Sequence, residues 1–116
     1  MNICIIIPAY NEEDYIVNTL ESLVNQTYPI KEIVIVNDNS TDNTRGVIDS
    51  FSEKHSFIKS ITTKSEAIHL PGSKVINAFY KGFEFIDKEY DLICKIDADL
   101  IFPSNYFESI SKNNNN

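Results

Sequence analysis

Short runs of hydrophobic residues alternate along this chain with segments in which hydrophobic residues recur at helical spacing. Residues 3–7 and 33–36 are apolar throughout, and residues 92–96 are interrupted only by Lys95. Unbroken apolar runs are typical of strands that are covered on both faces of a parallel sheet. Each run is therefore predicted to be a buried strand, and the apolar positions within 57–61 predict a further, weaker one.

Between these runs the hydrophobic residues are spaced every three or four positions, which predicts amphipathic helices. The first helix is expected from Glu12 onward, and its first turn would hold three acidic residues, where the helix dipole favours negative charge. Further helices are predicted around residues 47–51, 75–86 and 104–111. Residues 62–72 are expected to form a loop.

Alternating strands and helices predict an α/β fold with a mainly parallel sheet, flanked by helices and joined by right-handed crossovers. The chain has 116 residues, of which 42% are hydrophobic, enough for one core but not for two. We expect one domain over residues 1–112. Residues 113–116, four consecutive asparagines, are expected to be a disordered polar tail.

Polar residues follow the predicted strands at the point where each strand ends. Tyr10 and Glu12 follow the first strand, Asp38 ends the second, and Asp97 and Asp99 follow the last. The carboxyl ends of parallel strands meet at one edge of the sheet, which is where open α/β sheets bind ligands. Three carboxylate-bearing loops are therefore expected to converge on one crevice.

Asp97 and Asp99 are separated by one residue and would repel each other without a positive partner. Hard oxygen ligands of this kind suit Mg²⁺ or Mn²⁺, which proteins commonly hold through one or two carboxylates plus substrate phosphates. The alternative is that either side chain only caps the turn or helix that follows. Glu12 has the same two interpretations, as a ligand or as an ordinary acid in a first helical turn.

Charge and cysteine content limit the classes of partner. Ten basic and 17 acidic residues give a net charge of −7, which argues against a nucleic-acid partner and against attraction to anionic lipid. Cys4 and Cys94 fall in predicted strands and are interpreted as core residues of a cytoplasmic, reducing environment. The chain shows neither a signal peptide nor a membrane-spanning apolar run. His55 and His69 are interpreted as lone histidines and are assigned no catalytic role.

Three motifs resemble, in order and spacing, the opening motifs of the family 2 glycosyltransferases with the GT-A fold. They read IIPAYNEE at residues 6–13, VIVNDNSTD at residues 34–42 and KIDAD at residues 95–99. The resemblance covers essentially the whole chain. It implies a Rossmann-like half-domain that binds a nucleotide sugar, and it identifies the last motif with the metal-binding Asp-x-Asp (DXD) motif of that family.

The resemblance assigns seven residues to the sugar-nucleotide donor: Pro8, Ala9, Tyr10, Glu12, Asp38, Asp97 and Asp99. The first four would line the nucleoside pocket, and Asp38 would face the base. Asp97 would lie near the ribose and diphosphate, and Asp99, with Asp97, would bind the divalent metal. A carboxylate can accept the N3–H of uracil, and a tyrosine ring offers the base a flat face. A metal would stabilise the charge that grows on the departing diphosphate.

Two positions depart from the family pattern. Asn39 stands where the family commonly has glycine, and asparagine also adopts the left-handed backbone conformation, so the turn is expected to survive. Lys74 lies in a region that matches the family only loosely. It can approach a phosphate, or it is simply an exposed helical lysine.

The resemblance implies transfer of a sugar from a UDP-sugar to a glycan or lipid-linked acceptor, with inversion, in polysaccharide biosynthesis. The general base and acceptor pocket of the family lie beyond the DXD motif, so we expect a truncated, donor-binding fragment with little activity alone. Any contact with the inner face of a membrane would come through regions outside this chain. An incomplete sheet would expose an edge, which predicts a homo-oligomer.

Two other classes of protein remain open. A non-catalytic nucleotide-sugar-binding or scaffold module would use the same half-domain, and it would bind UDP weakly with little dependence on metal. A phospho-accepting receiver domain is also α/β, but it requires an acidic pair after the first strand. This chain has Pro8, Ala9 and Tyr10 there instead.

Overall fold

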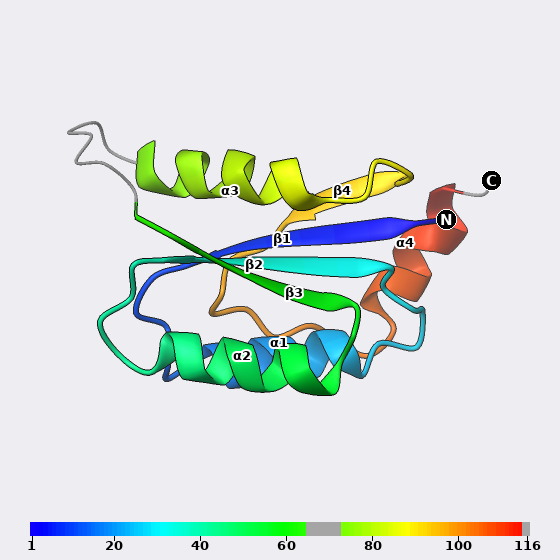
Figure 1. Cartoon of the computed structure of the whole chain (residues 1–116). Helices are drawn as coiled ribbons and strands as arrows, with labels where there is room; N and C mark the ends of the chain where they lie inside the picture. Colours follow the sequence, from blue (N-terminus) through cyan, green and yellow to red (C-terminus); the bar gives the residue numbers. More distant parts are fainter. Residues whose placement is uncertain (65–72, 115–116) are drawn as a thin grey trace.

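The computed structural model describes residues 1–64 and 73–114. Within them, four parallel strands form one sheet in the order β3-β2-β1-β4 (Figure 1). The strands are β1 (Ile3–Ala9), β2 (Glu32–Asp38), β3 (Ile58–Thr63) and β4 (Leu92–Lys95). The predicted α/β fold with a parallel sheet is confirmed.

Helices cover both faces of the sheet. Helices α1 (Ile16–Val24) and α2 (Thr44–Lys54) lie on one face, and α3 (Ser73–Phe85) lies on the other (Figure 1). Helix α4 (Tyr106–Asn114) contributes Phe107, which is 1% exposed, to the core on the side of α1 and α2.

The alternation of side chains along β1 explains its unbroken apolar run. Ile3, Ile5 and Ile7 belong to the core cluster that contains residues of α1 and α2, whereas Cys4 and Ile6 belong to the cluster under α3. All five residues are fully buried. A central strand covered by helices on both faces has no position for an exposed polar side chain, so every residue of the run is apolar.

The prediction for β4 was wrong in one respect. Leu92, Ile93 and Cys94 were expected in a central strand covered on both faces, but β4 lies at one edge of the described sheet and these side chains are only partly buried. Within the described residues β4 pairs with β1 alone. Only Ile96, beyond the end of the strand, is fully packed, at 5% exposure.

The boundaries of two helices also differ from expectation. Helix α1 begins at Ile16, so the three acids from Glu12 to Asp14 precede it rather than occupy its first turn. Helix α4 continues to Asn114 and so includes two of the four asparagines expected to form a tail. Residues 115–116 and most of the expected loop at 62–72, with His69, lie outside the described residues.

Helix α3 packs its small residues against the sheet. A Cβ atom on Gly82 would lie 2.7 Å from Ile6 Cγ2 and 2.9 Å from Val36 Cγ2, so the helix backbone approaches β1 and β2 closely. Val75 and Ile76, two of the apolar positions that predicted this helix, are 43% and 55% exposed. The structure does not describe the side chain of Lys74.

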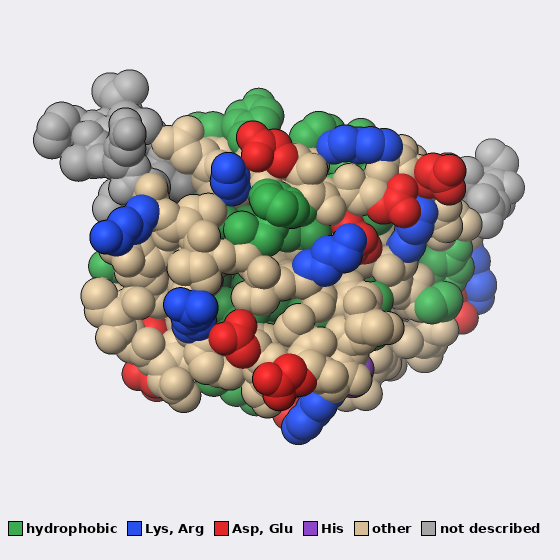
Figure 2. All heavy atoms as spheres, in the orientation of Figure 1, with side chains coloured by type: hydrophobic (Ala, Val, Ile, Leu, Met, Phe, Trp, Pro, Cys, Tyr) green, Lys and Arg blue, Asp and Glu red, His purple; other side chains and the backbone are tan. Residues whose placement is uncertain are grey.

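Both cysteines are free thiols, Cys4 buried and Cys94 partly buried, and burial raises the pKa of each. His55 packs its ring between those of Phe51 and Phe57. No helix in the described segments has the length and apolar character needed to cross a bilayer. On the face drawn in Figure 2, acidic and basic side chains are interspersed, so that face carries no continuous basic surface.

Candidate functional site

A pocket with a volume of about 420 Å³ lies at the carboxyl ends of the strands. Its lining comprises Pro8, Ala9, Tyr10, Glu12, Asp38, Val75, Ala78, Asp97, Ala98 and Asp99. All seven residues singled out from the sequence are among them. The expected convergence of three acid-bearing loops on one crevice is therefore found. Val75 and Ala78 of α3 form a wall that the sequence motifs did not reveal.

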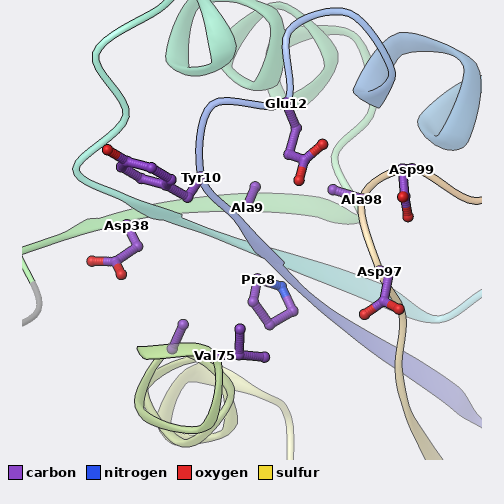
Figure 3. A pocket seen from close by; sticks show the side chains of 10 residues that line it. Pro8, Ala9, Tyr10, Glu12, Asp38, Val75, Asp97, Ala98 and Asp99 are labelled. Carbon is purple, nitrogen blue, oxygen red and sulfur yellow. The ribbon is translucent and has the colours of Figure 1, made fainter. Parts of the chain in front are cut away.

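The two ends of this pocket differ in chemistry (Figure 3). Tyr10 and Asp38 lie together at one end, and Asp97 and Asp99 lie at the opposite end, with the Glu12 carboxylate pointing into the space beside them. Pro8 lies between the two ends. The pocket therefore has one end with an aromatic ring and a single acid, and a second end with several acids.

Asn11 joins the loop after β1 to the loop after β2. Its side-chain oxygen accepts the backbone N–H of Thr41 at 2.8 Å, and its side-chain nitrogen donates to Thr41 Oγ1 at 3.2 Å. Its backbone N–H donates to Ser40 Oγ at 3.1 Å. Asn11 and Asn39 both have positive φ angles, 50° and 55°. The left-handed conformation predicted for Asn39 is confirmed.

A second set of hydrogen bonds joins the same two loops further from the sheet. The backbone N–H of Glu12 donates to Thr44 Oγ1 at 2.8 Å, and that of Glu13 donates to Asp42 Oδ2 at 3.4 Å. These bonds join the segment before α1 to Asp42 and to the first residue of α2. The loops carrying Tyr10 and Asp38 thus form one connected rim, which the polar sequence between residues 37 and 42 indicated only as a turn.

Asp38 is the last residue of β2 and is 6% exposed. Thr63, at the end of β3, donates its hydroxyl to Asp38 Oδ1 at 3.4 Å. Helix α2 begins at Thr44, with Asn43 at its N-cap, so Asp38 does not cap that helix.

The acid-rich end has a negative electrostatic potential. Burial is the largest factor that raises the pKa of Glu12, and the charges of Asp99, Asp42 and Asp97 raise it further. Lys95 Nζ lies 3.0 Å from Asp97 Oδ1 and offsets part of this charge. A cation bound among these carboxylates would relieve their repulsion.

The donor atoms at this end fit a divalent cation of the magnesium type. No cluster of three or more potential side-chain ligands is present in residues 1–64 and 73–114. Asp97 and Asp99 together offer hard carboxylate oxygens, and Mg²⁺ or Mn²⁺ typically completes its coordination with water and phosphate. Helix α4 begins only at Tyr106, so neither aspartate caps a following helix. The residues present thus suit a cation shared with a phosphate ligand.

Comparison with known proteins identifies the same family as these motifs. The family model described as Glycosyl transferase family 2 matches residues 4–113. The probable glycosyltransferase YdaM of Bacillus subtilis (strain 168) is 40% identical over 99 residues, which are 84% of this chain and 22% of that protein. Poly-beta-1,6-N-acetyl-D-glucosamine synthase of Staphylococcus epidermidis is 33% identical over 115 residues, 96% of this chain and 26% of the synthase.

The fold also matches solved structures. The crystal structure of S. aureus TarS 1-349 in complex with UDP-GlcNAc superposes with a TM-score of 0.76 and 25% sequence identity, over 97% of this chain and 30% of that one. The two curated relatives named above are longer proteins, and this chain spans about a quarter of the length of each. On the match of the family model over residues 4–113, the chain belongs to glycosyl transferase family 2.

Proposed function

We propose that this chain binds a nucleoside-diphosphate sugar, specifically a UDP-sugar, and forms the donor-binding part of a glycosyltransferase. The observation that carries the proposal is that seven motif residues, from the ends of β1 and β2 and from the segments after β1 and β4, line one pocket. The similarity to TarS, which was crystallised with UDP-GlcNAc, supports the same ligand class. The proposed domain comprises residues 1–112.

The end of the pocket with Tyr10 and Asp38 suits the base. Tyr10 is 53% exposed, and an aromatic ring offers a base a flat face. Asp38 is fixed by β2 and by Thr63, so its carboxylate can accept the N3–H of uracil without first being ordered. Cytosine has no N3–H and would present a lone pair to this carboxylate instead.

The acid-rich end suits the diphosphate together with Mn²⁺ or Mg²⁺. Asp99, with Asp97, would hold the cation, which when bound supplies the positive charge that stabilises a departing diphosphate. Glu12 lies beside them and adds to the negative potential that attracts the cation. We also assign Asp97 to the ribose, since it lines the same pocket as Pro8 (Figure 3).

For the whole protein we propose transfer of the sugar, with inversion, to a glycan or lipid-linked acceptor. The relationship to a poly-N-acetylglucosamine synthase supports a role in polysaccharide synthesis. A general base must take the proton from the acceptor hydroxyl. None of the seven motif residues is assigned that task here, because each has a proposed role in binding the donor.

Calorimetric titration with UDP and CDP, both in Mn²⁺, tests the assignment of the two ends. The wild type should bind UDP about tenfold more tightly than CDP, as expected for one well-formed polar contact. Asp38→Asn offers an N–H group to cytosine N3 and should reduce or reverse this preference. Asp14→Asn makes the same chemical change at an exposed position outside the pocket and should leave it unchanged. Equal binding of UDP and CDP by the wild type would contradict the proposed base contact.

A further inference from the structure

A buried threonine on α1 contacts the backbone between the two aspartates of the DXD motif. Thr19 is fully buried, and its hydroxyl donates to the carbonyl oxygen of Ala98 at 2.9 Å. The same hydroxyl lies 3.4 Å from the carbonyl oxygen of Tyr15, one turn earlier in the helix. The shorter distance makes Ala98 the main partner, so this threonine bonds across to the motif rather than back to its own helix.

Ser22 of α1 and Gln26, two residues beyond the end of that helix, continue this contact after Ala98. The bonds are Phe102 N–H to Ser22 Oγ (3.1 Å), Gln26 Nε2 to Pro103 O (2.6 Å) and Phe107 N–H to Gln26 Oε1 (3.1 Å). Residues 96–105 contain neither helix nor strand. This segment is therefore held by side chains of α1 and of Gln26, together with the backbone bonds from Ile96 to Ile6 and from Thr27 to Ser104.

An apolar residue would suit the position of Thr19 better if packing alone mattered. The neighbouring buried positions of α1 are Ile16, Leu20 and Leu23. Threonine has a lower helix propensity than leucine, and a buried hydroxyl requires a hydrogen-bond partner. The gain that offsets these costs is the bond to Ala98.

We infer that Thr19 is a positioning residue for the acid-rich end of the pocket and acts through Ala98. The inference rests on the proposed function. The peptide group that contains the Ala98 carbonyl is planar and ends at the Cα atom of Asp99, so fixing this carbonyl restricts the backbone of Asp99 directly and that of Asp97 one residue further away. Holding the two aspartates in place reduces the ordering cost when a cation and a diphosphate bind.

The test is the coupling between cation and nucleotide. Calorimetry gives the Kd of UDP in EDTA and in saturating Mn²⁺, and the ratio of the two values is the coupling factor. Thr19→Val keeps the shape of the side chain but removes the hydroxyl, and it should lower the coupling factor about tenfold. Thr19→Ser restores the hydroxyl and should keep the factor within about twofold of the wild type.

A matched control separates positioning from stability. Ser52 Oγ donates to the carbonyl oxygen of Ile58 at 2.9 Å, a comparable bond between α2 and the start of β3. Ser52→Ala should therefore lower the melting temperature to a similar extent without changing the coupling factor. A purely structural role for Thr19 would give Thr19→Val the same behaviour as Ser52→Ala.

Each outcome decides one question. A wild type without Mn²⁺-dependent UDP binding overturns the proposed function itself. If UDP binding to the wild type depends on Mn²⁺ and a folded Thr19→Val variant has the same coupling factor, only this inference is overturned. If circular dichroism shows that Thr19→Val does not fold, Ser22→Ala takes its place, because it removes the next bond of the same helix to the segment. The coupling factor should then fall roughly threefold, and an unchanged factor overturns the inference.

Discussion

The side-chain oxygen of Asn11 accepts the backbone N–H of Thr41 at 2.8 Å, which joins the loop after β1 to the loop after β2. Asn11 does this with a φ angle of 50°, a left-handed conformation that asparagine and glycine tolerate better than other residues. One residue thus provides both the hydrogen bonds and the backbone turn that place Tyr10 near Asp38.

Two substitutions at Asn11 separate these contributions. Asn11→Gly keeps the left-handed backbone but loses the amide, and it should reduce the free energy of unfolding by about 1–2 kcal/mol. Asn11→Ala loses the amide and also strains the backbone, so it should cost about 1 kcal/mol more. Urea denaturation measures both values.

Asn18, exposed on α1, provides the control for Asn11. Asn18→Ala should change the free energy of unfolding by less than about 0.5 kcal/mol, and in the stabilising direction, because alanine favours the helix. An Asn11→Gly variant as stable as the wild type would show that the link between the loops contributes nothing to stability.

Gly82→Ala tests the close approach of α3 to the sheet. The added Cβ would meet Ile6 and Val36 at less than 3 Å, and both belong to central strands that cannot move easily. Overpacking of this kind should cost about 1–3 kcal/mol. The shift of α3 should also weaken UDP binding, because Val75 and Ala78 of the same helix line the pocket.

Gly46→Ala on α2 is the matched comparison. Its added Cβ would meet mainly the side-chain end of Asn43, which is exposed and can rotate away. Helix propensity should then dominate and raise stability by up to about 1 kcal/mol. Chemical denaturation of the two variants should therefore give changes of opposite sign, and equal changes would show that α3 does not pack as closely as described.

Asp42 predicts an acid-sensitive contribution to stability. Desolvation raises the pKa of Asp42, but hydrogen bonds from the Thr44 hydroxyl and backbone and from the Glu13 backbone outweigh it, so the pKa in the folded state is lowered from its ordinary value of 3.8. A depressed carboxyl pKa stabilises the fold above the unfolded-state pKa, and this stabilisation is lost as the pH falls through the folded-state pKa. Asp42→Asn should therefore be less stable than the wild type at pH 7, with the difference shrinking below about pH 4. Urea denaturation between pH 3 and 7 measures the effect, and a difference that does not vary with pH would contradict it.

The strands and helices could be predicted from the sequence because the two kinds of element have clearly different patterns of hydrophobic residues in this fold. β1 is buried on both faces and apolar throughout, and β2 is apolar from Ile33 to Val36, whereas the helices are buried on one side only. The position of β4 could not be predicted in this way. A strand buried on both faces and an edge strand with partly buried side chains have the same short apolar run, as Leu92, Ile93 and Cys94 illustrate.

The start of α1 was missed for a different reason. Acids at residues 12–14 suit a first helical turn, but they precede α1, and the backbone N–H groups of Glu12 and Glu13 donate to Thr44 of α2 and to Asp42. Such tertiary contacts override local preference and leave no periodic signal in sequence. The same holds for Thr19, whose partner Ala98 is 79 residues away along the chain.

The pocket was predictable because parallel strands place their carboxyl ends at one edge of the sheet. Polar residues at or after the ends of three strands were enough to predict that Tyr10, Asp38 and Asp99 line one pocket. The walls from α3 were not predictable, because Val75 and Ala78 belong to an ordinary amphipathic pattern that gives no sign of facing a ligand.

The most direct test of donor binding is a thermal-shift titration with UDP, in Mn²⁺ and in EDTA, on the wild type, Asp99→Asn and the exposed control Asp14→Asn. UDP at about 100 times its Kd should stabilise the wild type and the control by roughly 2.7 kcal/mol in Mn²⁺, a shift of several degrees in Tm. The wild type and the control should show no shift in EDTA, and Asp99→Asn should show none in Mn²⁺ or in EDTA. Equal shifts in Mn²⁺ and EDTA, or an Asp99→Asn variant that responds like the wild type, would contradict a cation held by Asp99 beside the nucleotide.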